Sequence, residues 1–332
     1  MKSRPRLRRT PIISTLLLAT ACLAQTPSAN IPRDDTVRVR EFYRLSSQIQ
    51  DQLWPHWSET PAPLLLVTAD SEFLTHRPSP PKDFTKITDD FYARPRQFPV
   101  NLLATFPAFG PPSVIVVGEP ANTTSKTSTP WLITLMHEHF HQLQDSQPGL
   151  DEAITKLGLS HGDMTGMWML NYPFPYDNQE VVASFGQLRD LLVAAIAEKD
   201  KGKFATLAAQ YLTQRKHFLA QLSPDDHKYF EFQLWKEGVA RYTQVKAAEA
   251  AAQYQPSAEY TALPDFESFA DYATKARSET LAQLKQAELA KLKRLAVYSF
   301  GAGEGLLLDR LKPDWKDEYF KHPLSMDFFF EN

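Results

Sequence analysis

The chain has 332 residues, of which 43% are hydrophobic and 23% are charged. These values are typical of soluble globular proteins and argue against a disordered chain or a bundle of membrane helices. The formal net charge is −3, but the first 24 residues carry five basic side chains and no acidic ones, so the remainder has a charge of −8. Such an acidic chain lacks the basic surface that binds nucleic acid or anionic lipid, so neither is an expected partner.

The start of the chain has the pattern of a secretory signal peptide. Five basic residues precede an apolar run at 12–19, and small residues follow it. This order is typical of a cleaved leader, and the run is too short to span a bilayer permanently. We expect residues 1–24 to be removed by cleavage after Ala24, with lipidation at Cys22 as the alternative. Either outcome predicts an exported protein, periplasmic or secreted, with no later membrane-spanning segment.

Cys22 is also the only cysteine of the chain. If the leader is cleaved after Ala24, the mature protein has no thiol, which rules out disulfides and thiolate metal ligands. A zinc ion would then have to be bound by histidine, aspartate or glutamate.

After the leader, residues 25–129 are expected to form a small α/β portion. Apolar residues at helical spacing predict a helix over 37–54. Three apolar runs, rich in residues that favour strands, predict three strands. These runs lie at 63–68, 99–106 and 113–118. The last run is the clearest, and residues 113–117 are expected to form an edge strand of the sheet.

Residues 130–332 are expected to be mostly helical, because apolar residues recur there at helical spacing. The predicted helices lie at 130–145, 178–199, 203–222, 226–253, 266–292 and 294–311. Together the two portions predict an α+β fold, in which a small mixed sheet adjoins a larger helical portion.

The helix expected at 130–145 carries the run His137-Glu138-His139-Phe140-His141. Helical residues four apart lie on one face, so His137 and His141 can bind one metal ion. Glu138 projects about 100° further round the axis, within reach of a water on that ion. Zinc acidifies such a water and a nearby glutamate accepts its proton, so the motif predicts hydrolysis with Glu138 as general base. His139 points away from the motif face and is expected to be structural.

A catalytic zinc site needs a third protein ligand and an open fourth position. Glu237 is the favoured candidate, because it lies in a predicted helix and is followed by Gly238. A glycine inside a helix indicates close packing, here expected against the motif helix. His161, twenty residues after His141 in a glycine-flanked segment, remains the alternative ligand.

The H-E-x-x-H motif at 137–141 and the E-G-x-A-x-Y motif at 237–242 together resemble the gluzincin metallopeptidases. This clan contains the thermolysin-like enzymes and the zinc aminopeptidases. The resemblance implies a zincin-like catalytic portion in which His137, His141 and Glu237 bind zinc. It also implies peptide-bond hydrolysis as the activity.

The chain departs from the usual pattern of those families. Glu237 follows the second histidine by 96 residues, far more than is usual there, which implies an inserted helical segment. Arg241 stands where thermolysin-like enzymes have an aspartate behind the ligands, whereas Asp145 matches their H-E-x-x-H-x-x-x-D pattern and is expected to support the site. The element by which zinc aminopeptidases hold a free N-terminus is not found, so their exopeptidase specificity is not expected.

A developing oxyanion needs a hydrogen-bond donor besides the metal. Tyr298 follows Glu237 by 61 residues and resembles in position the tyrosine used by the aminopeptidase branch. Tyr242 is the nearer alternative, but its offset of five from Glu237 places it on a different side of the helix. Tyr298 is therefore expected to be the second catalytic residue.

These observations predict an exported zinc metallopeptidase, with Zn²⁺ as cofactor and a peptide or protein as substrate. The alternative from another class is a non-catalytic, zinc-containing binding or envelope-assembly protein that retains the zincin fold. Lipidation at Cys22 would favour the envelope role. The intact Glu138 argues against a non-catalytic site, because a purely structural zinc site needs no base beside the metal.

Overall fold

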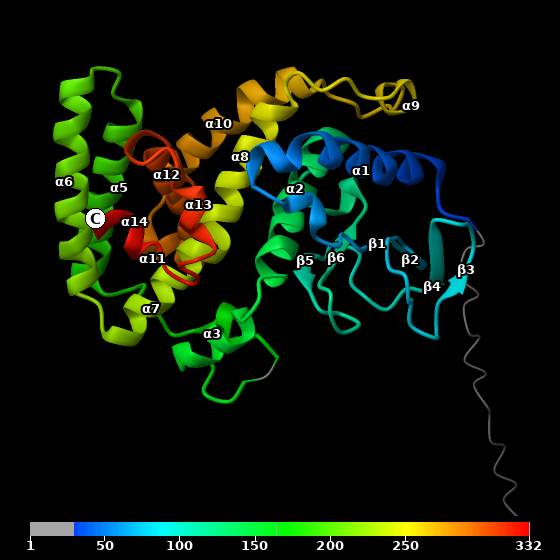
Figure 1. The fold of residues 1–332 in the computed structure, drawn as a ribbon, viewed down its shortest axis with the longest axis horizontal. Coiled ribbons are helices and arrows are strands. Elements are labelled where there is room, and N and C mark those ends of the chain that lie inside the picture. Colours follow the sequence, from blue (N-terminus) through cyan, green and yellow to red (C-terminus); the bar gives the residue numbers. More distant parts are fainter. Residues whose placement is uncertain (1–29, 164, 332) are drawn as a thin grey trace, which may run out of the picture.

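The computed structural model describes residues 30–163 and 165–331. A six-stranded mixed sheet lies at one end of the molecule and most helices lie at the other, as Figure 1 shows. The predicted α+β class is confirmed. The predicted leader at residues 1–24, including Cys22, lies outside the described residues. Among the helices of the described part, none is long and apolar enough to cross a membrane.

The strands are β1 (Leu64–Val67), β2 (Ser71–Thr75), β3 (Thr85–Lys86), β4 (Phe91–Pro95), β5 (Leu103–Phe106) and β6 (Val114–Gly118). Their order across the sheet is β3-β4-β2-β1-β6-β5. β1 and β6 run parallel, and every other neighbouring pair is antiparallel. The expectation that residues 113–117 form an edge strand is wrong, because β6 pairs with β1 on one side and β5 on the other. The edge strands are β3 and β5, and β5 is the one beside β6.

Both faces of the sheet are apolar. Successive side chains of a strand point to opposite faces. In β1, Leu64 and Leu66 therefore pack into the main core, whereas Leu65 and Val67 belong to a second, smaller cluster that Phe84 helps to close. A strand buried on both faces has a continuous apolar sequence, which is why β1 and β6 are evident from sequence alone.

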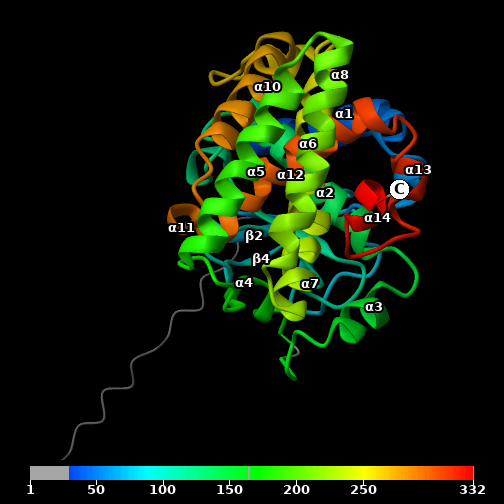
Figure 2. The same cartoon turned by 90° about the vertical axis from the view of Figure 1, so that its left-hand side faces the viewer.

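The helices of the N-terminal half are α1 (Arg33–Leu53), α2 (Ser128–Asp145), α3 (Leu150–Leu157) and α4 (Trp168–Asn171). Those that follow are α5 (Gln179–Ala197), α6 (Lys201–Ala220), α7 (Pro224–Gln233), α8 (Val239–Ala251), α9 (Ala258–Thr261), α10 (Phe269–Lys285), α11 (Leu289–Leu292), α12 (Ala296–Leu311), α13 (Lys316–Tyr319) and α14 (Asp327–Glu331). α12 contacts α5, α8 and α10, and Figure 2 shows α5 and α6 as an outer layer in front of it.

One hydrophobic core joins the sheet to the helical body. α2 contacts β5 and β6 on one side and α8 on the other, and α1 packs on both α2 and α8. The boundary predicted between residues 129 and 130 falls in the first turn of α2. The motif helix therefore connects the two parts of the molecule.

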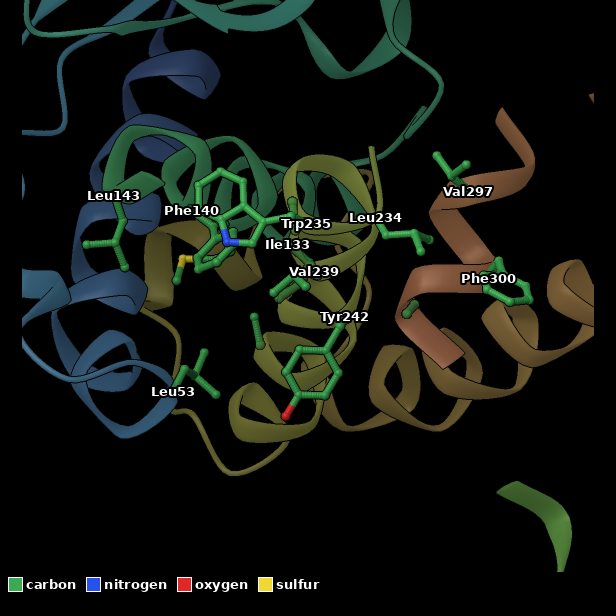
Figure 3. Close-up of a cluster of buried hydrophobic side chains, with 14 of the residues drawn as sticks. Leu53, Ile133, Phe140, Leu143, Leu234, Trp235, Val239, Tyr242, Val297 and Phe300 are labelled. Atoms are coloured by element: carbon green, nitrogen blue, oxygen red, sulfur yellow. The ribbon is translucent and has the colours of Figure 1, made fainter. Parts of the chain in front are cut away.

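α7 and α8 form one helical segment that packs closely on α12. A π-helical turn, η3 (Leu234–Gly238), joins them. A Cβ added at Gly238 would lie 2.7 Å from the Cα of Gly301 on α12, so these two backbones touch. The expectation that Gly238 packs on the motif helix is therefore wrong, since its partner is α12. Leu234 lies beside this contact, because its Cδ2 atom would be 3.3 Å from a Cβ added at Gly301, and Figure 3 shows Leu234 and, on α12, Phe300.

Candidate metal centre

His137 and His141 lie one turn apart on α2, where the helical spacing places both rings on one face. Both side chains are buried. Their Nε2 atoms are 3.2 Å apart, and the two rings are nearly perpendicular, at 86°. Two imidazole nitrogens at this distance need a shared proton or cation between them, because their lone pairs would otherwise repel.

Glu237 reaches the same point from the π-helical turn. Its Oε2 atom lies 3.4 Å from Nε2 of His141 and 3.8 Å from Nε2 of His137. A tetrahedral zinc ion with bonds of about 2.0–2.1 Å has ligand atoms separated by about 3.3 Å. Two of the three separations match that spacing and the third, 3.8 Å, is longer, so the ligand cluster (His137, His141 and Glu237) is close to the geometry that a zinc ion with one open position needs.

The π-helical turn decides where Glu237 points. The N–H of Val239 donates to the carbonyl of Leu234, five residues back, which widens the turn and changes the direction of the residues within it. Leu234 and Trp235 anchor this turn in the core (Figure 3). π-Helical turns of this kind are found frequently at functional sites.

The electrostatics of the ligand cluster favour a bound cation. Burial lowers the pKa of His137. Burial also acts to lower the pKa of His141, but the charge and hydrogen bond of Glu237 outweigh it, so the pKa is raised. Burial acts to raise the pKa of Glu237, but the two histidines outweigh it and hold that pKa well below its ordinary value. An ionised carboxylate thus faces two imidazoles in a buried site.

Glu138 is held beside the ligand cluster by the edge strand. Thr105 of β5 donates from Oγ1 to Oε2 of Glu138 at 2.8 Å, and the same hydroxyl lies 3.0 Å from the Glu138 carbonyl. Glu138 is buried on α2. Sequence reasoning missed Thr105, because the contact joins residues 33 positions apart.

Gln144 orients one of the histidines and was also missed. Its amide nitrogen donates to the carbonyls of Trp235 and Lys236, so its Oε1 is left to accept from Nδ1 of His141 at 2.7 Å. With Nδ1 engaged by Gln144, Nε2 is the nitrogen of His141 that is turned to Glu237 and to Nε2 of His137. Its position three residues after His141, on the same helix face, is the signal that could have identified it.

Tyr298 lies on the other side of the histidines, in the first turn of α12. Its ring is parallel to that of His137, at 6° and 6.2 Å between centroids. Nη1 of Arg294 donates to its hydroxyl oxygen at 3.0 Å, and the phenolic O–H has Glu237 as its hydrogen-bond acceptor. Burial, followed by the charge of Glu237, raises the pKa of Tyr298, so the phenol stays protonated. Arg294 is a third residue that sequence reasoning missed.

Two candidate residues lie away from the ligand cluster. His161 is exposed in a turn, with a positive φ of 46°, and belongs to neither group of potential metal ligands within the described part of the chain. Tyr242 donates its hydroxyl to Asp309 at 2.6 Å, and its ring packs against Gly305 of α12. The geometry therefore favours Glu237 over His161, and Tyr298 over Tyr242.

The residues flanking the motif have structural contacts. His139 is stacked on Trp57, and burial lowers its pKa to about 4, so it is a neutral core residue, as expected. Asp145 accepts from Lys236 and from Ser113, so it supports the site by joining α2 to the turn that carries Glu237.

A second group of potential ligands, His227, Glu231 and Asp327, already has a cation. Arg215 donates to Glu231 and to Asp327, both at 2.6 Å. Its guanidinium already balances the charge of both carboxylates. The ligand cluster around His137 is therefore the better candidate in the described residues.

Comparisons of the chain with protein families, with curated proteins and with solved structures give no significant match.

Proposed function

We propose that this protein is an exported zinc metallopeptidase of the gluzincin type. One observation carries the proposal. Residues 96 positions apart in the chain meet with the spacing of zinc ligands, and Glu138 lies beside them. The chemistry of the donor set, two imidazoles and a carboxylate, is that of a catalytic zinc site with an open position.

Zinc in this cluster would supply Lewis acidity, which activates water and polarises a substrate carbonyl. Glu138 accepts the proton of the attacking water and passes it to the leaving amine. Thr105 keeps the Glu138 carboxylate in place through its hydroxyl. Tyr298 donates its O–H to the oxyanion that develops on the carbonyl. Glu138 and Tyr298 are thus the proposed catalytic residues.

The sheet edge supports an extended peptide as substrate. β5 pairs only with β6 among the described strands, so its other edge has free backbone donors and acceptors. Thr105 belongs to this edge strand and contacts Glu138, so a peptide added beside β5 would run past the proposed base. Strand addition of this kind is a common way to bind peptides.

The test compares the wild-type protein with the Glu237→Gln, His161→Gln and Glu138→Gln variants. We expect about one zinc ion per wild-type chain, lost in Glu237→Gln and retained in His161→Gln, the matched control. Glu138→Gln should retain zinc but cleave a random peptide library about 10²–10⁴-fold more slowly, because the general base is absent. Full cleavage activity in Glu138→Gln, or zinc loss in His161→Gln with none in Glu237→Gln, would refute the proposed site. Zinc binding without any cleavage would favour the non-catalytic alternative.

A further inference from the structure

Two buried arginines show how this protein provides hydrogen-bond acceptors for a guanidinium that is removed from water. Arg215 binds Glu304, Asp327 and Glu231 through Nε, Nη1 and Nη2, at 2.8, 2.6 and 2.6 Å. Arg94 binds two carboxylates in the same way. Because removing a guanidinium from water is costly, buried arginines need partners of this kind.

Among the residues that the structure describes, Arg294 has no carboxylate within hydrogen-bonding distance, although its side chain is only 21% exposed. Its hydrogen bond within the described residues is the one from Nη1 to the hydroxyl oxygen of Tyr298. The carboxylate within ion-pair range is Glu237, whose Oε1 lies 3.8 Å from Nη1, beyond hydrogen-bonding distance. A guanidinium has five N–H donors, so four are left without a protein acceptor in the described part of the chain.

A bound metal ion would leave Arg294 without a counter-ion. Glu237 directs Oε2 at the two histidines, so an ion in the ligand cluster takes up its charge. The side chains of Glu237, Glu138 and Arg294 have a summed formal charge of −1. A divalent ion would change this sum to +1. A buried positive centre with unused N–H donors attracts an anion.

The chain segment that carries Arg294 is held in an unusual conformation. Lys293 has φ 49° and ψ −130°, a region that residues other than glycine rarely adopt. The neighbouring Leu292 and Leu295 are 39% and 58% exposed. The strained turn thus carries Lys293 and Arg294 between two exposed leucines, and Arg294 is the one of these two cations that approaches Glu237.

We propose that Arg294 binds the free C-terminal carboxylate of the substrate, so that the enzyme is a carboxypeptidase. The inference rests on the proposed function, which places the reacting carbonyl at a metal ion in the ligand cluster. A planar guanidinium matches a carboxylate in bidentate geometry, and the exposed leucines suit the apolar part of a terminal residue. Arg294 is then a specificity-determining residue.

The position of Arg294 limits the length of the released fragment. Nη1 lies 3.8 Å from Oε1 of Glu237, and Oε2 of the same carboxylate is the oxygen directed at the histidines, so the guanidinium would be within about 7 Å of an ion bound there. An extended chain advances about 3.3–3.6 Å per residue. The bound carboxylate therefore belongs to the first or second residue after the cleaved bond. The expected product is a single amino acid or a dipeptide.

The test measures binding separately from cleavage. Zinc-loaded Glu138→Gln protein is titrated with random N-acetylated tetrapeptides, either with a free C-terminus or amidated. We expect the free acids to bind about 10- to 100-fold more tightly, as for a charge-assisted hydrogen-bonded pair. Introducing Arg294→Gln into the Glu138→Gln protein should abolish this preference while the zinc content stays the same. Introducing Arg294→Lys in its place should retain part of the preference. Lys291→Gln is the control, because it removes a nearby, exposed positive charge that does not contact the cluster.

Three results would overturn the carboxypeptidase inference. Equal binding of acids and amides, or binding of neither, would show that Arg294 does not select a chain end. Arg294-dependent binding of amidated peptides that contain acidic side chains would show that Arg294 binds an acidic side chain of the substrate and not its C-terminus. Loss of zinc in Arg294→Gln would make Arg294 a support for Glu237. Arg294-dependent binding of free acids without cleavage by the wild-type protein would uphold the carboxylate site and refute only the hydrolytic function.

Discussion

At the residue scale, two histidines of α2 have the same hydrogen-bond arrangement but different surroundings. His141 donates from Nδ1 to Gln144 at 2.7 Å, and His139 donates to Gln142 at 2.9 Å. Both glutamines lie three residues after their histidine and both are buried. Of these two histidines, His141 is the one that faces Glu237, so Gln144 is the glutamine expected to influence metal binding.

This pairing gives a prediction with a built-in control. Gln144→Leu should weaken zinc binding about 10- to 100-fold, because the ring of His141 loses the partner that fixes its orientation and protonation. Gln142→Leu removes the matching bond to His139 and should leave zinc affinity unchanged. Both variants should be less stable, since each glutamine also donates to backbone carbonyls. Chelator competition on the folded proteins measures the difference, and equal zinc affinities would contradict this role of Gln144.

The residues of the candidate site divide into those visible in the sequence and those that are not. Helical periodicity is enough to pair His137 with His141, because both lie in one helix. Thr105 contacts Glu138 and Arg294 approaches Glu237, both far apart in the sequence, and a threonine or an arginine alone carries no recognisable pattern. Their roles depend on tertiary packing that a local pattern does not encode.

At the element scale, the helical segment that carries Glu237 shows a similar limit. Its apolar spacing predicts one uninterrupted helix over 226–253, and the structure has a π-helical turn inside it. Gly238 was the only local indication of something unusual, and its partner was assigned to the wrong helix. The turn depends on a backbone contact with Gly301, 63 residues away, so no local rule could have located it.

This contact predicts opposite effects for two glycine substitutions. Gly238→Ala should destabilise the protein by about 1–3 kcal/mol and weaken zinc binding, because the new Cβ would collide with backbone of α12 and displace the turn. Gly186→Ala on α5 meets nothing within 4 Å and should instead add about 0.5–1 kcal/mol through higher helix propensity. Chemical denaturation and zinc titration measure both effects. A neutral Gly238→Ala would mean that α8 and α12 can separate without cost to the site.

At the scale of the whole molecule, the fold class could be predicted from sequence, but half of the sheet could not. The predicted strands are those with long apolar runs. β2 and β4 were missed because polar residues such as Glu72 and Arg94 interrupt them, and these two pair with each other inside the fold. Their stability comes from pairing across the sheet, which becomes visible only when the strands are assembled.

The helical body is joined by a buried ion network that crosses several elements. Arg215 of α6 binds Glu231 of α7, Glu304 of α12 and Asp327 of α14. Burial raises the pKa of Glu231 to about 7 even with Arg215 in contact. Removing the arginine would raise it further, because a buried carboxylate without a cation favours its neutral form.

Arg215→Met should therefore destabilise the protein in a pH-dependent way. The pKa of Glu231 is higher in the folded protein than its value of 4.5 in the unfolded chain. The folded protein therefore loses stability as the pH rises through the folded pKa. The loss should reach about 3–5 kcal/mol at pH 8, where uncompensated carboxylates are buried, and be smaller at pH 5, where Glu231 is protonated.

Denaturation of the zinc-free proteins at both pH values measures this difference without interference from metal release. Arg310→Met is the control, because Arg310 of α12 packs over Phe204 and donates to the carbonyl of Ala195, with no ion pair to a carboxylate among residues 30–163 and 165–331. Its loss of stability should be the same at both pH values. If Arg215→Met behaved like Arg310→Met, the carboxylates around Arg215 would have found other partners or water. The network would then contribute packing, and the junction of α6, α7, α12 and α14 would not depend on charge.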